Sequence, residues 1–485
     1  MLETVDLTAK LPKADFKQTY EKLEIRLSEL QRAIREAGIP VVVVLDGWTA
    51  AGVGTAMGRI LSSLDPRGYK LHNMGDPTLE ESLRPPLWRY WVSLPKAGAI
   101  SIYDGSWYDT ILRRGKPKPR EFVSIRTFER QLTDDGTVVV KFWLHISKEE
   151  QGKRFKKMEK DPSLSWKVSK RDWRRHKDYD HYLSLVETML TQTSTANAPW
   201  TLVPSHDHRY ATVRIAETLI AAFEAALART APAPTEVKLP PRRVSPLDNV
   251  NLAVTISRDD YEQKLPKLQD KLLHLEHDLY LPRVPVVIVY EGWDASGKGG
   301  NIKRLVSNLD HRGVEVIPVG PPEGDEKTHH YLWRFWRALP KGGHITVFDR
   351  SWYGRVLVER VEGFARPDEW QRAYREINEF EEELTAFGTV IIKFWIHISK
   401  DEQLRRFKLR EETSYKQWKI TPDDWRNREK WDAYYEAVSD MIERTSTAAA
   451  PWTIIEGNQK LHARITAIRT VNAAIEKALK KSSLR

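Results

Sequence analysis

Residues 286–300 read VVIVYEGWDASGKGG, in which a β-branched run leads directly into a glycine-rich turn. The turn contains the pattern G-x-x-x-x-G-K at Gly292, Gly297 and Lys298. Between a strand and a helix, such a turn directs backbone N–H groups at an anion, and its lysine neutralises a phosphoryl group in transfer. We therefore expect a phosphate-binding loop here. The alternative is a tight strand–helix turn with an incidental lysine.

Buried apolar runs alternate with helical stretches along the rest of the chain. The runs lie at 345–348, 390–398 and 452–455, with counterparts at 100–103, 138–146 and 200–203. This alternation predicts an α/β fold with a parallel sheet and helices on both faces. In such sheets ligands bind beyond the carboxyl ends of the strands, where the glycine turn lies.

The chain contains this arrangement twice. Residues 41–55 read VVVVLDGWTAAGVGT, 245 positions before 286–300, and KFWLHISK at 141–148 precedes KFWIHISK at 393–400 by 252 positions. Repeats this long are a domain duplication, because solenoid units are far shorter. The proline-rich stretch 231–246 lacks hydrophobic periodicity and is typical of a linker. We predict domains at 1–230 and 251–485, joined by a linker at 231–250.

The first copy has lost charge at the expected phosphate site. The replaced positions are Thr49 for Asp294, Val53 for Lys298, Gly105 for Arg350, Thr110 for Arg355, Met158 for Arg410 and Leu164 for Lys416. The apolar frame is unchanged. We therefore expect catalysis in the second domain and little or none in the first.

Carboxylates near the loop are the candidate metal ligands. Lys298 is followed by Gly299, not by the Ser or Thr that usually supplies a hydroxyl to Mg²⁺. Asp294 in the loop and Asp349 at the end of the run 345–348 are then the expected ligands. Arg350 beside Asp349 is placed to stabilise the transferring phosphoryl group, although a strand-end salt bridge is the alternative.

The segment 401–435 is rich in Arg and Lys and contains three tryptophans, which predicts a basic helical lid over phosphates. A solvated helix face is the alternative for those cations that both copies share. His397 lies within a predicted strand, as does His145 in the first copy, and we interpret both as structural. No zinc-binding or nucleophile-elbow motif is present.

Composition limits the class of protein. The 485 residues are 41% hydrophobic and carry a formal charge of +10, which favours a folded protein with a polyanionic partner. The chain has no cysteine, so disulfides and thiolate chemistry are excluded. No apolar run is long enough for a membrane span, and the N-terminus has no signal-peptide pattern. We expect a cytoplasmic protein without membrane or nucleic-acid partners. The sequence leaves open whether it is a homo-oligomer.

Four motifs in order, EGWDASGKGG (291–300), FDRSWYGRVLVER (348–360), KFWIHISKDEQLRRF (393–407) and TSTAAAPW (445–452), resemble the type-2 polyphosphate kinase family. The resemblance covers nearly the whole chain, once per half. It implies two tandem P-loop kinase-like domains, each with a five-stranded parallel sheet and a helical lid. It also implies phosphoryl transfer from inorganic polyphosphate to an adenine nucleotide with Mg²⁺, or Mn²⁺ in its place. The tandem form is similar to the subgroup that converts AMP to ADP.

The resemblance also implies roles for individual residues. Asp294, Lys298, Asp349 and Arg350 would be catalytic, with Asp294 and Asp349 as metal ligands. Phosphate and substrate would be bound by Gly292, Ser296, Gly297, Gly299, Gly300, Lys303, Arg304, Arg355, Arg410, Lys416 and Lys419.

Three alternatives remain open from the sequence. The acceptor could be ADP or GDP, the donor could be ATP as in thymidylate kinases, or the protein could bind a polyanion such as RNA without catalysis. An ATP-dependent kinase would not need so many cations. A protein that only binds a polyanion would not need the intact loop.

Overall fold

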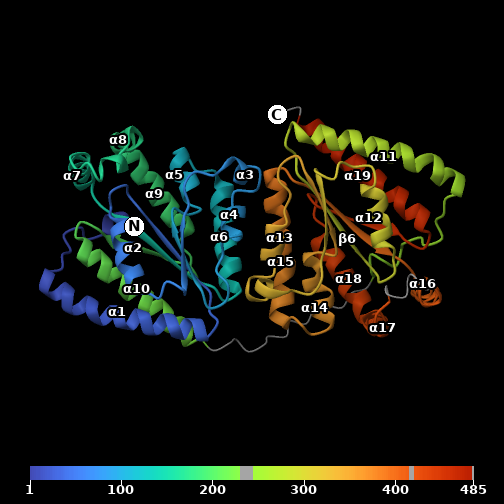
Figure 1. Cartoon of the computed structure of the whole chain (residues 1–485), viewed down its shortest axis with the longest axis horizontal. Coiled ribbons are helices and arrows are strands. Elements are labelled where there is room, and N and C mark those ends of the chain that lie inside the picture. Colours follow the sequence, from blue (N-terminus) through green and yellow to red (C-terminus); the bar gives the residue numbers. More distant parts are fainter. Residues whose placement is uncertain (230–243, 414–419, 483–485) are drawn as a thin grey trace. The chain divides into compact units, whose positions relative to one another are not determined.

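The computed structural model describes residues 1–229, 244–413 and 420–482 (Figure 1). These residues divide into two compact units. The first comprises residues 1–77, 89–231 and 324–330, and the second comprises residues 78–88, 232–323 and 331–485. Each unit therefore includes one short segment from the other half of the sequence. Most of the predicted linker, along with Lys416 and Lys419, lies outside the described residues.

The N-terminal half of the sequence contains five strands: β1 Val41–Gly47, β2 Tyr69–Asn73, β3 Ile100–Asp104, β4 Val138–His145 and β5 Trp200–Pro204. Its helices are η1 Leu2–Thr4, α1 Lys13–Glu36, α2 Val53–Ser62, α3 Leu79–Ser82, α4 Trp88–Trp91, α5 Asp109–Arg114, α6 Pro119–Asp134, α7 Lys148–Glu159, η2 Ser165–Lys167, α8 Lys170–Lys177, α9 Tyr179–Thr193 and α10 His208–Leu227.

The C-terminal half repeats the pattern with strands β6 Val286–Gly292, β7 Val314–Pro318, β8 Ile345–Asp349, β9 Val390–His397 and β10 Trp452–Glu456. Its helices are α11 Arg258–Tyr280, α12 Lys298–Val306, η3 Gly324–Thr328, α13 Trp333–Arg337, η4 Trp352–Val356, α14 Val358–Val361, α15 Pro367–Phe387, α16 Lys400–Glu412, α17 Pro422–Glu429, α18 Trp431–Thr445 and α19 Lys460–Ser482.

Each unit is built on one five-stranded parallel sheet, as the sequence predicts. The strand orders are β2-β3-β1-β4-β5 and β10-β9-β6-β8-β7, which are the same order in corresponding strands. In the second sheet β6 is central, with Val286 opposite Ile345 of β8 and Val390 of β9. The chain places β8 and β7 on one side of β6, and β9 and β10 on the other. The turn after β6 therefore lies at the switch point of the strand order, where such sheets bind ligands.

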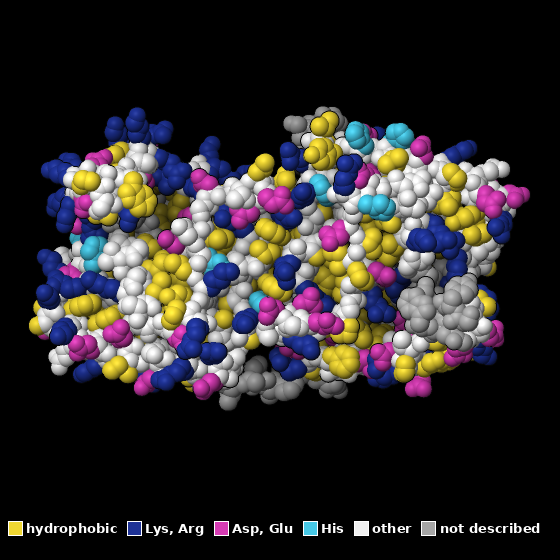
Figure 2. Space-filling model, viewed as in Figure 1, with side chains coloured by type: hydrophobic (Ala, Val, Ile, Leu, Met, Phe, Trp, Pro, Cys, Tyr) yellow, Lys and Arg dark blue, Asp and Glu magenta, His cyan; other side chains and the backbone are white. Residues whose placement is uncertain are grey.

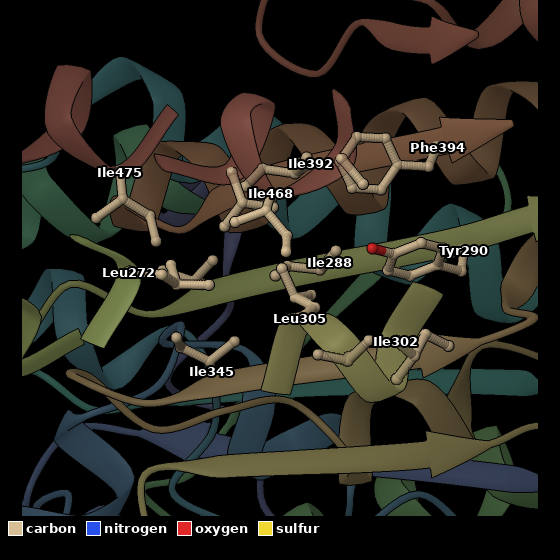
Figure 3. Close-up of a cluster of buried hydrophobic side chains, with 14 of the residues drawn as sticks. Leu272, Ile288, Tyr290, Ile302, Leu305, Ile345, Ile392, Phe394, Ile468 and Ile475 are labelled. Atoms are coloured by element: carbon tan, nitrogen blue, oxygen red, sulfur yellow. The ribbon is translucent and has the colours of Figure 1, made fainter. Parts of the chain in front are cut away.

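Alternation along β6 separates the two faces of the sheet. Ile288 and Tyr290 point to the face covered by α11, α12 and α19, where they join a buried cluster that includes Leu272, Leu305 and Ile468 (Figure 3). On the other face α15 packs against β9, and α18 packs against α15. Because both faces are covered, the inner strands β6, β8 and β9 are mostly apolar and buried, as expected for a parallel sheet, whereas the edge strand β7 is largely exposed.

A buried ion pair is preserved in both copies. The ammonium of Lys393 donates to Glu381 at 2.7 Å, to the Tyr353 hydroxyl at 2.9 Å and to the Thr445 carbonyl at 2.7 Å. In the first copy Lys141 donates to Glu129 at 2.7 Å with the same kinds of further partners. Such a lysine is tolerated in a core only when it is paired and fully hydrogen-bonded. This shared network belongs to the fold and not to the chemistry that differs between the copies.

No helix of the described residues is long and apolar enough to cross a membrane.

Candidate active site

The loop after β6 has the backbone of an anion site. Gly292 and Gly297 have φ values of 152° and 108°, and Ala295 lies in the left-handed region with a φ of 60°. Helix α12 begins at Lys298, so its first unpaired N–H groups and the positive end of its dipole face the loop. The buried hydroxyl of Ser296 has no hydrogen-bond partner among the described residues. A buried hydroxyl left unpaired in this loop fits a phosphate oxygen as its missing partner.

Lys298 is half-buried and directed along the loop. Its ammonium donates to the carbonyl oxygens of Gly292 at 2.7 Å and Trp293 at 3.3 Å. Burial, together with the Arg350 guanidinium, lowers the pKa of Lys298, while Asp294, Asp349 and Glu291 oppose that shift. The lysine predicted from the motif is therefore part of a cluster of five charged groups at the end of β6.

Asp294 and Arg350 form an ion pair across the loop, with 3.2 Å between the Arg350 Nη2 and the Asp294 Oδ1. The other carboxylate oxygen accepts from the Asn427 amide of α17 at 2.9 Å. The Asp294 carbonyl accepts from Gln403 of α16 at 3.2 Å. The helices of the predicted lid thus contact the loop at the aspartate that the first copy lacks.

Asp349 ends β8 beside Tyr290, as the strand prediction requires. The structure adds Glu291, a buried carboxylate that sequence reasoning missed. Glu291 accepts a hydrogen bond from Ser351 at 2.8 Å, and burial raises its pKa to about 6. Asp46 holds the equivalent place in the first copy, bonded to Ser106, and burial likewise raises its pKa. Because an acid is present in both copies, a comparison of the copies could not single it out.

The remaining predicted cations lie in different settings. Arg355 pairs with Glu359 at 3.0 Å and stacks 4.6 Å from the Tyr331 ring centre. Lys303 is exposed on α12, whereas Arg304 is half-buried and donates to the Gly300 carbonyl at 3.2 Å. Arg410 on α16 is half-buried. Lys303 and Arg304 therefore lie on α12, the helix that follows the loop. Arg355 forms an ion pair with Glu359, outside the loop.

Two further cations come from α19. The Arg464 guanidinium lies 3.7 Å from the position that a Cβ on Gly300 would take. Burial and the nearby Arg406, Arg410 and Arg464 lower the pKa of Lys460 to about 8. Their counterparts 252 positions earlier are His208 and Thr212. The comparison of copies that identified Arg410 would have found both residues if it had been extended past residue 452.

Arg406 has a structural role. Its guanidinium donates to the carbonyls of Ala295 at 3.0 Å and Ser296 at 2.7 Å. It also donates to the carbonyls of residues 457 and 458 and pairs with Glu402. Arg154 makes the same kinds of contacts to the loop of the first copy. This arginine holds the loop and is present in both copies, although the first copy lacks the loop charges of the second.

His397 and His145 are structural, as predicted. Each ring accepts a hydrogen bond at Nδ1 from the indole of the first loop tryptophan, Trp293 at 3.1 Å and Trp48 at 2.8 Å. Burial lowers the pKa of both imidazoles to about 4. Neutral rings engaged in this way orient the loops and are not placed to transfer protons.

The loop of the first copy is altered beyond the lost lysine. Ala51 replaces Ser296, so the buried hydroxyl is gone. The His208 ring packs on the loop, with its Cε1 only 2.5 Å from where a Cβ on Gly52 would lie. The first copy keeps the strand–turn–helix geometry. The His208 imidazole, however, lies against its loop at Gly52, whereas no ring of the described residues lies against Gly297 in the second copy.

The described residues contain no group of three or more His, Cys, Asp or Glu side chains arranged to hold a metal ion. Asp294 and Asp349 supply two carboxylates. Mg²⁺ is commonly bound by one or two carboxylates, with phosphates and water completing the octahedron. The donor set therefore fits a magnesium ion that arrives with its phosphate ligands.

Known proteins resemble the chain over nearly its whole length. The family model described as polyphosphate kinase 2 matches residues 10–231 and 255–483. A polyphosphate:AMP phosphotransferase of Pseudomonas aeruginosa is 42% identical over 96% of this chain and 97% of its own length. One from Acinetobacter johnsonii is 38% identical over 93% and 95%.

Structural comparison agrees with these matches. A crystal structure described as polyphosphate kinase 2 from Pseudomonas aeruginosa PA01 has a TM-score of 0.88 and 38% identity, covering 99% of this chain and all of the other. The fold, the duplication and the order of motifs all lead to the same assignment. The chain belongs to the polyphosphate kinase 2 family.

Proposed function

We propose that this protein transfers the terminal phosphoryl group of inorganic polyphosphate to AMP, giving ADP, and that the second domain carries out the reaction. The observation that carries the proposal is the cluster of Asp294, Lys298, Asp349 and Arg350 around one glycine loop, in a chain that matches polyphosphate:AMP phosphotransferases end to end. The first copy lacks three of these four residues.

In this reaction an oxygen of the AMP phosphate attacks the terminal phosphorus of the polymer. The bond from that phosphorus to its bridging oxygen breaks, and the polymer leaves one unit shorter. The transition state spreads charge over the phosphoryl oxygens, so catalysis depends on positioning and on cations. Lys298 and Arg350 supply that charge, while the N–H groups at the start of α12 and the Ser296 hydroxyl hold the phosphate. No side chain has to act as a nucleophile.

Asp294 and Asp349 are the residues that would hold Mg²⁺, or Mn²⁺ in its place. The ion would neutralise phosphate oxygens as charge develops on them. In the structure the Asp294 oxygens are engaged by Arg350 and Asn427. Arg350 therefore has to exchange its carboxylate for a phosphate when the metal and its phosphates bind.

The basic cluster next to α12 supports a polymeric donor. Arg304, Arg410, Lys460 and Arg464 provide more positive charge than a single nucleotide needs, and Lys460 and Arg464 are absent from the first copy. Because phosphate-rich donors demand distributed cations, this cluster favours polyphosphate over ATP. We also propose a cytoplasmic location, which suits a chain without cysteine.

A nucleoside diphosphate acceptor is the second candidate. A GDP-polyphosphate phosphotransferase of Pseudomonas aeruginosa is 40% identical, but over only 44% of this chain. The relatives that match this chain over nearly their whole length have AMP in their names, which supports AMP here.

A matrix of donors and acceptors tests the proposal. Long-chain polyphosphate and ATP are each combined with AMP, ADP, GMP and GDP, and products are separated by anion-exchange chromatography. We expect ADP from AMP with polyphosphate as the fastest reaction. Faster turnover of ADP or GDP would move the assignment to the second candidate, and activity with ATP alone would refute the polyphosphate donor.

A further inference from the structure

The first copy has lost charge at its loop but gained charge on its lid. Residues 148–177 contain twelve Lys and Arg against five Asp and Glu. The aligned residues 400–429 of the catalytic copy contain nine against seven. The net charge is therefore +7 on the degenerate lid and +2 on the catalytic one. We call residues 148–177, which form α7, η2 and α8, the basic surface.

Most of this charge is accessible. Nine of the twelve cations have exposed side chains: Lys153, Lys156, Lys157, Lys160, Lys167, Lys170, Arg171, Arg174 and Lys177. Figure 2 shows Lys and Arg side chains gathered over α7 and α8, at the upper left. Within the described parts of the chain, none of the nine forms an ion pair. Such a surface carries a positive potential that acidic neighbours do not cancel.

The catalytic lid differs in this respect. The exposed Arg405, which corresponds to Lys153, pairs with Glu402 at 2.7 Å. Arg426 pairs with Asp423 at 2.9 Å. The two copies thus differ in opposite senses at the two places: the first copy has fewer cations at its loop and more net positive charge on its lid.

The loop of the first copy is not the place where that charge acts. The His208 ring lies on Gly52, and the lysine, the aspartate and the serine hydroxyl of the catalytic loop are all replaced. An anion attracted to the first unit would thus be held on the helices by exposed lysines and not in a fixed cradle. Binding of this kind suits a flexible polymer with many equal charges, because it depends on charge density and not on shape.

We propose that the basic surface binds the polyphosphate donor and anchors long polymer chains to the enzyme. The inference rests on the proposed function, since it takes its ligand from that reaction. A long polymer offers many phosphates to this surface at once, whereas a donor of three phosphates is too short to gain from it. The degenerate copy then serves donor affinity and chain-length preference.

The test compares two sets of substitutions in the full chain. The first set replaces Lys153, Lys156, Lys157 and Lys160 by Gln. The control set replaces Lys10, Lys13, Lys17 and Lys22 by Gln, which are exposed lysines of the same unit on or just before α1. KM is measured for long-chain polyphosphate and for tripolyphosphate at saturating AMP.

For the first set we expect KM for the long polymer to rise about tenfold and KM for tripolyphosphate to change by less than about twofold. The KM of the long polymer should also depend less steeply on salt than in the wild type, because fewer counterions are displaced. The control set should leave both KM values within about twofold. Replacing Lys167, Lys170 and Lys177 by Gln gives an independent set on the same surface should the first set fail to fold.

The inference would be overturned if the KM for long polymer were unchanged both in the first set and in the independent set on the basic surface. An equal rise of that KM in the control set would also overturn it. So would loss of affinity for single-stranded RNA without any change in polyphosphate KM, because the surface would then serve a nucleic acid. If the wild type forms no ADP from AMP and polyphosphate, the proposed function itself fails. If it does so and the ratio of the two KM values is unaltered, only the anchoring surface fails.

Discussion

Arg350 lies in the left-handed backbone region, with a φ of 66°, where side chains other than Gly are disfavoured. Its counterpart Gly105 has a φ of 80°, so the degenerate copy keeps the turn without a side chain. Strain of this kind persists where function requires the side chain. The second copy accepts a less favourable backbone at the position that places a guanidinium beside Asp294.

Substituting Arg350 tests this interpretation. We expect Arg350→Gly and Arg350→Ala to lose similar amounts of activity, on the order of a hundredfold or more, because both remove the same charge. Gly relieves the backbone and Ala does not, so the Gly variant should be more stable than the Ala variant by about 1 kcal/mol. Urea unfolding and initial rates of ADP formation measure the two effects. Equal stability of the two variants would contradict the strain argument.

Glu291 gives a second prediction, on pH. Its pKa in the folded protein is about 6, above the usual 4.5, so the folded state holds the proton more tightly than the unfolded chain. The stability that this group contributes is full below about pH 4.5 and is lost as the pH rises through 6. Glu291→Gln imitates the protonated acid and should be about 2 kcal/mol more stable than the wild type at pH 7.

The gain for Glu291→Gln should disappear near pH 4.5, which thermal unfolding across pH 4.5 to 7.5 would reveal. A constant difference between variant and wild type over that range would show that Glu291 is not the titrating group.

At the scale of elements, Arg406 links α16 to the glycine loop and to the end of β10. Its counterpart Arg154 makes equivalent bonds in the first unit. Substituting each arginine in turn therefore distinguishes an effect on loop stability from an effect on catalysis. We expect Arg406→Gln to destabilise the second unit by about 3 kcal/mol and to lower kcat, since it breaks a buried charge pair and frees the loop.

Arg154→Gln is the matched control, and it should lower the stability of the first unit while leaving kcat within about twofold. Calorimetric unfolding and ADP formation would measure both variants. A large loss of kcat in Arg154→Gln would show that the loop of the first copy takes part in turnover.

The elements also show what the sequence could predict. Four of the five strands of each sheet, their parallel arrangement and the loop followed from short β-branched runs and glycine spacing, because these are local properties. The edge strands β2 and β7 were not predicted, because exposed polar side chains interrupt their apolar pattern. Asp294, Lys298, Asp349 and Arg350 lie together as predicted, since motifs at strand ends meet at one edge of the sheet. Glu291, Asn427, Lys460 and Arg464 were missed. Their importance depends on burial or on contacts between segments distant in the sequence, such as the bond between Asn427 and Asp294.

For the whole molecule, the proposed function assigns different roles to the two copies. The second has the charged loop, the lid contacts to Asp294 and the cations of α19, while the first retains the sheet, the buried Lys141–Glu129 pair and a more basic lid. Restoring one residue should not restore chemistry to the first copy, because Thr49, Ala51, Gly105 and His208 remain unsuitable for phosphate.

The most direct test of this account is the rate of ADP formation from AMP and long-chain polyphosphate by three full-length variants. Lys298→Ala should lower kcat by about a thousandfold, and Val53→Ala, its match in the first copy, should leave kcat unchanged. Val53→Lys combined with Lys298→Ala should be as inactive as Lys298→Ala alone. Near-normal turnover by Lys298→Ala, or its rescue by Val53→Lys, would contradict the assignment of catalysis to the second domain.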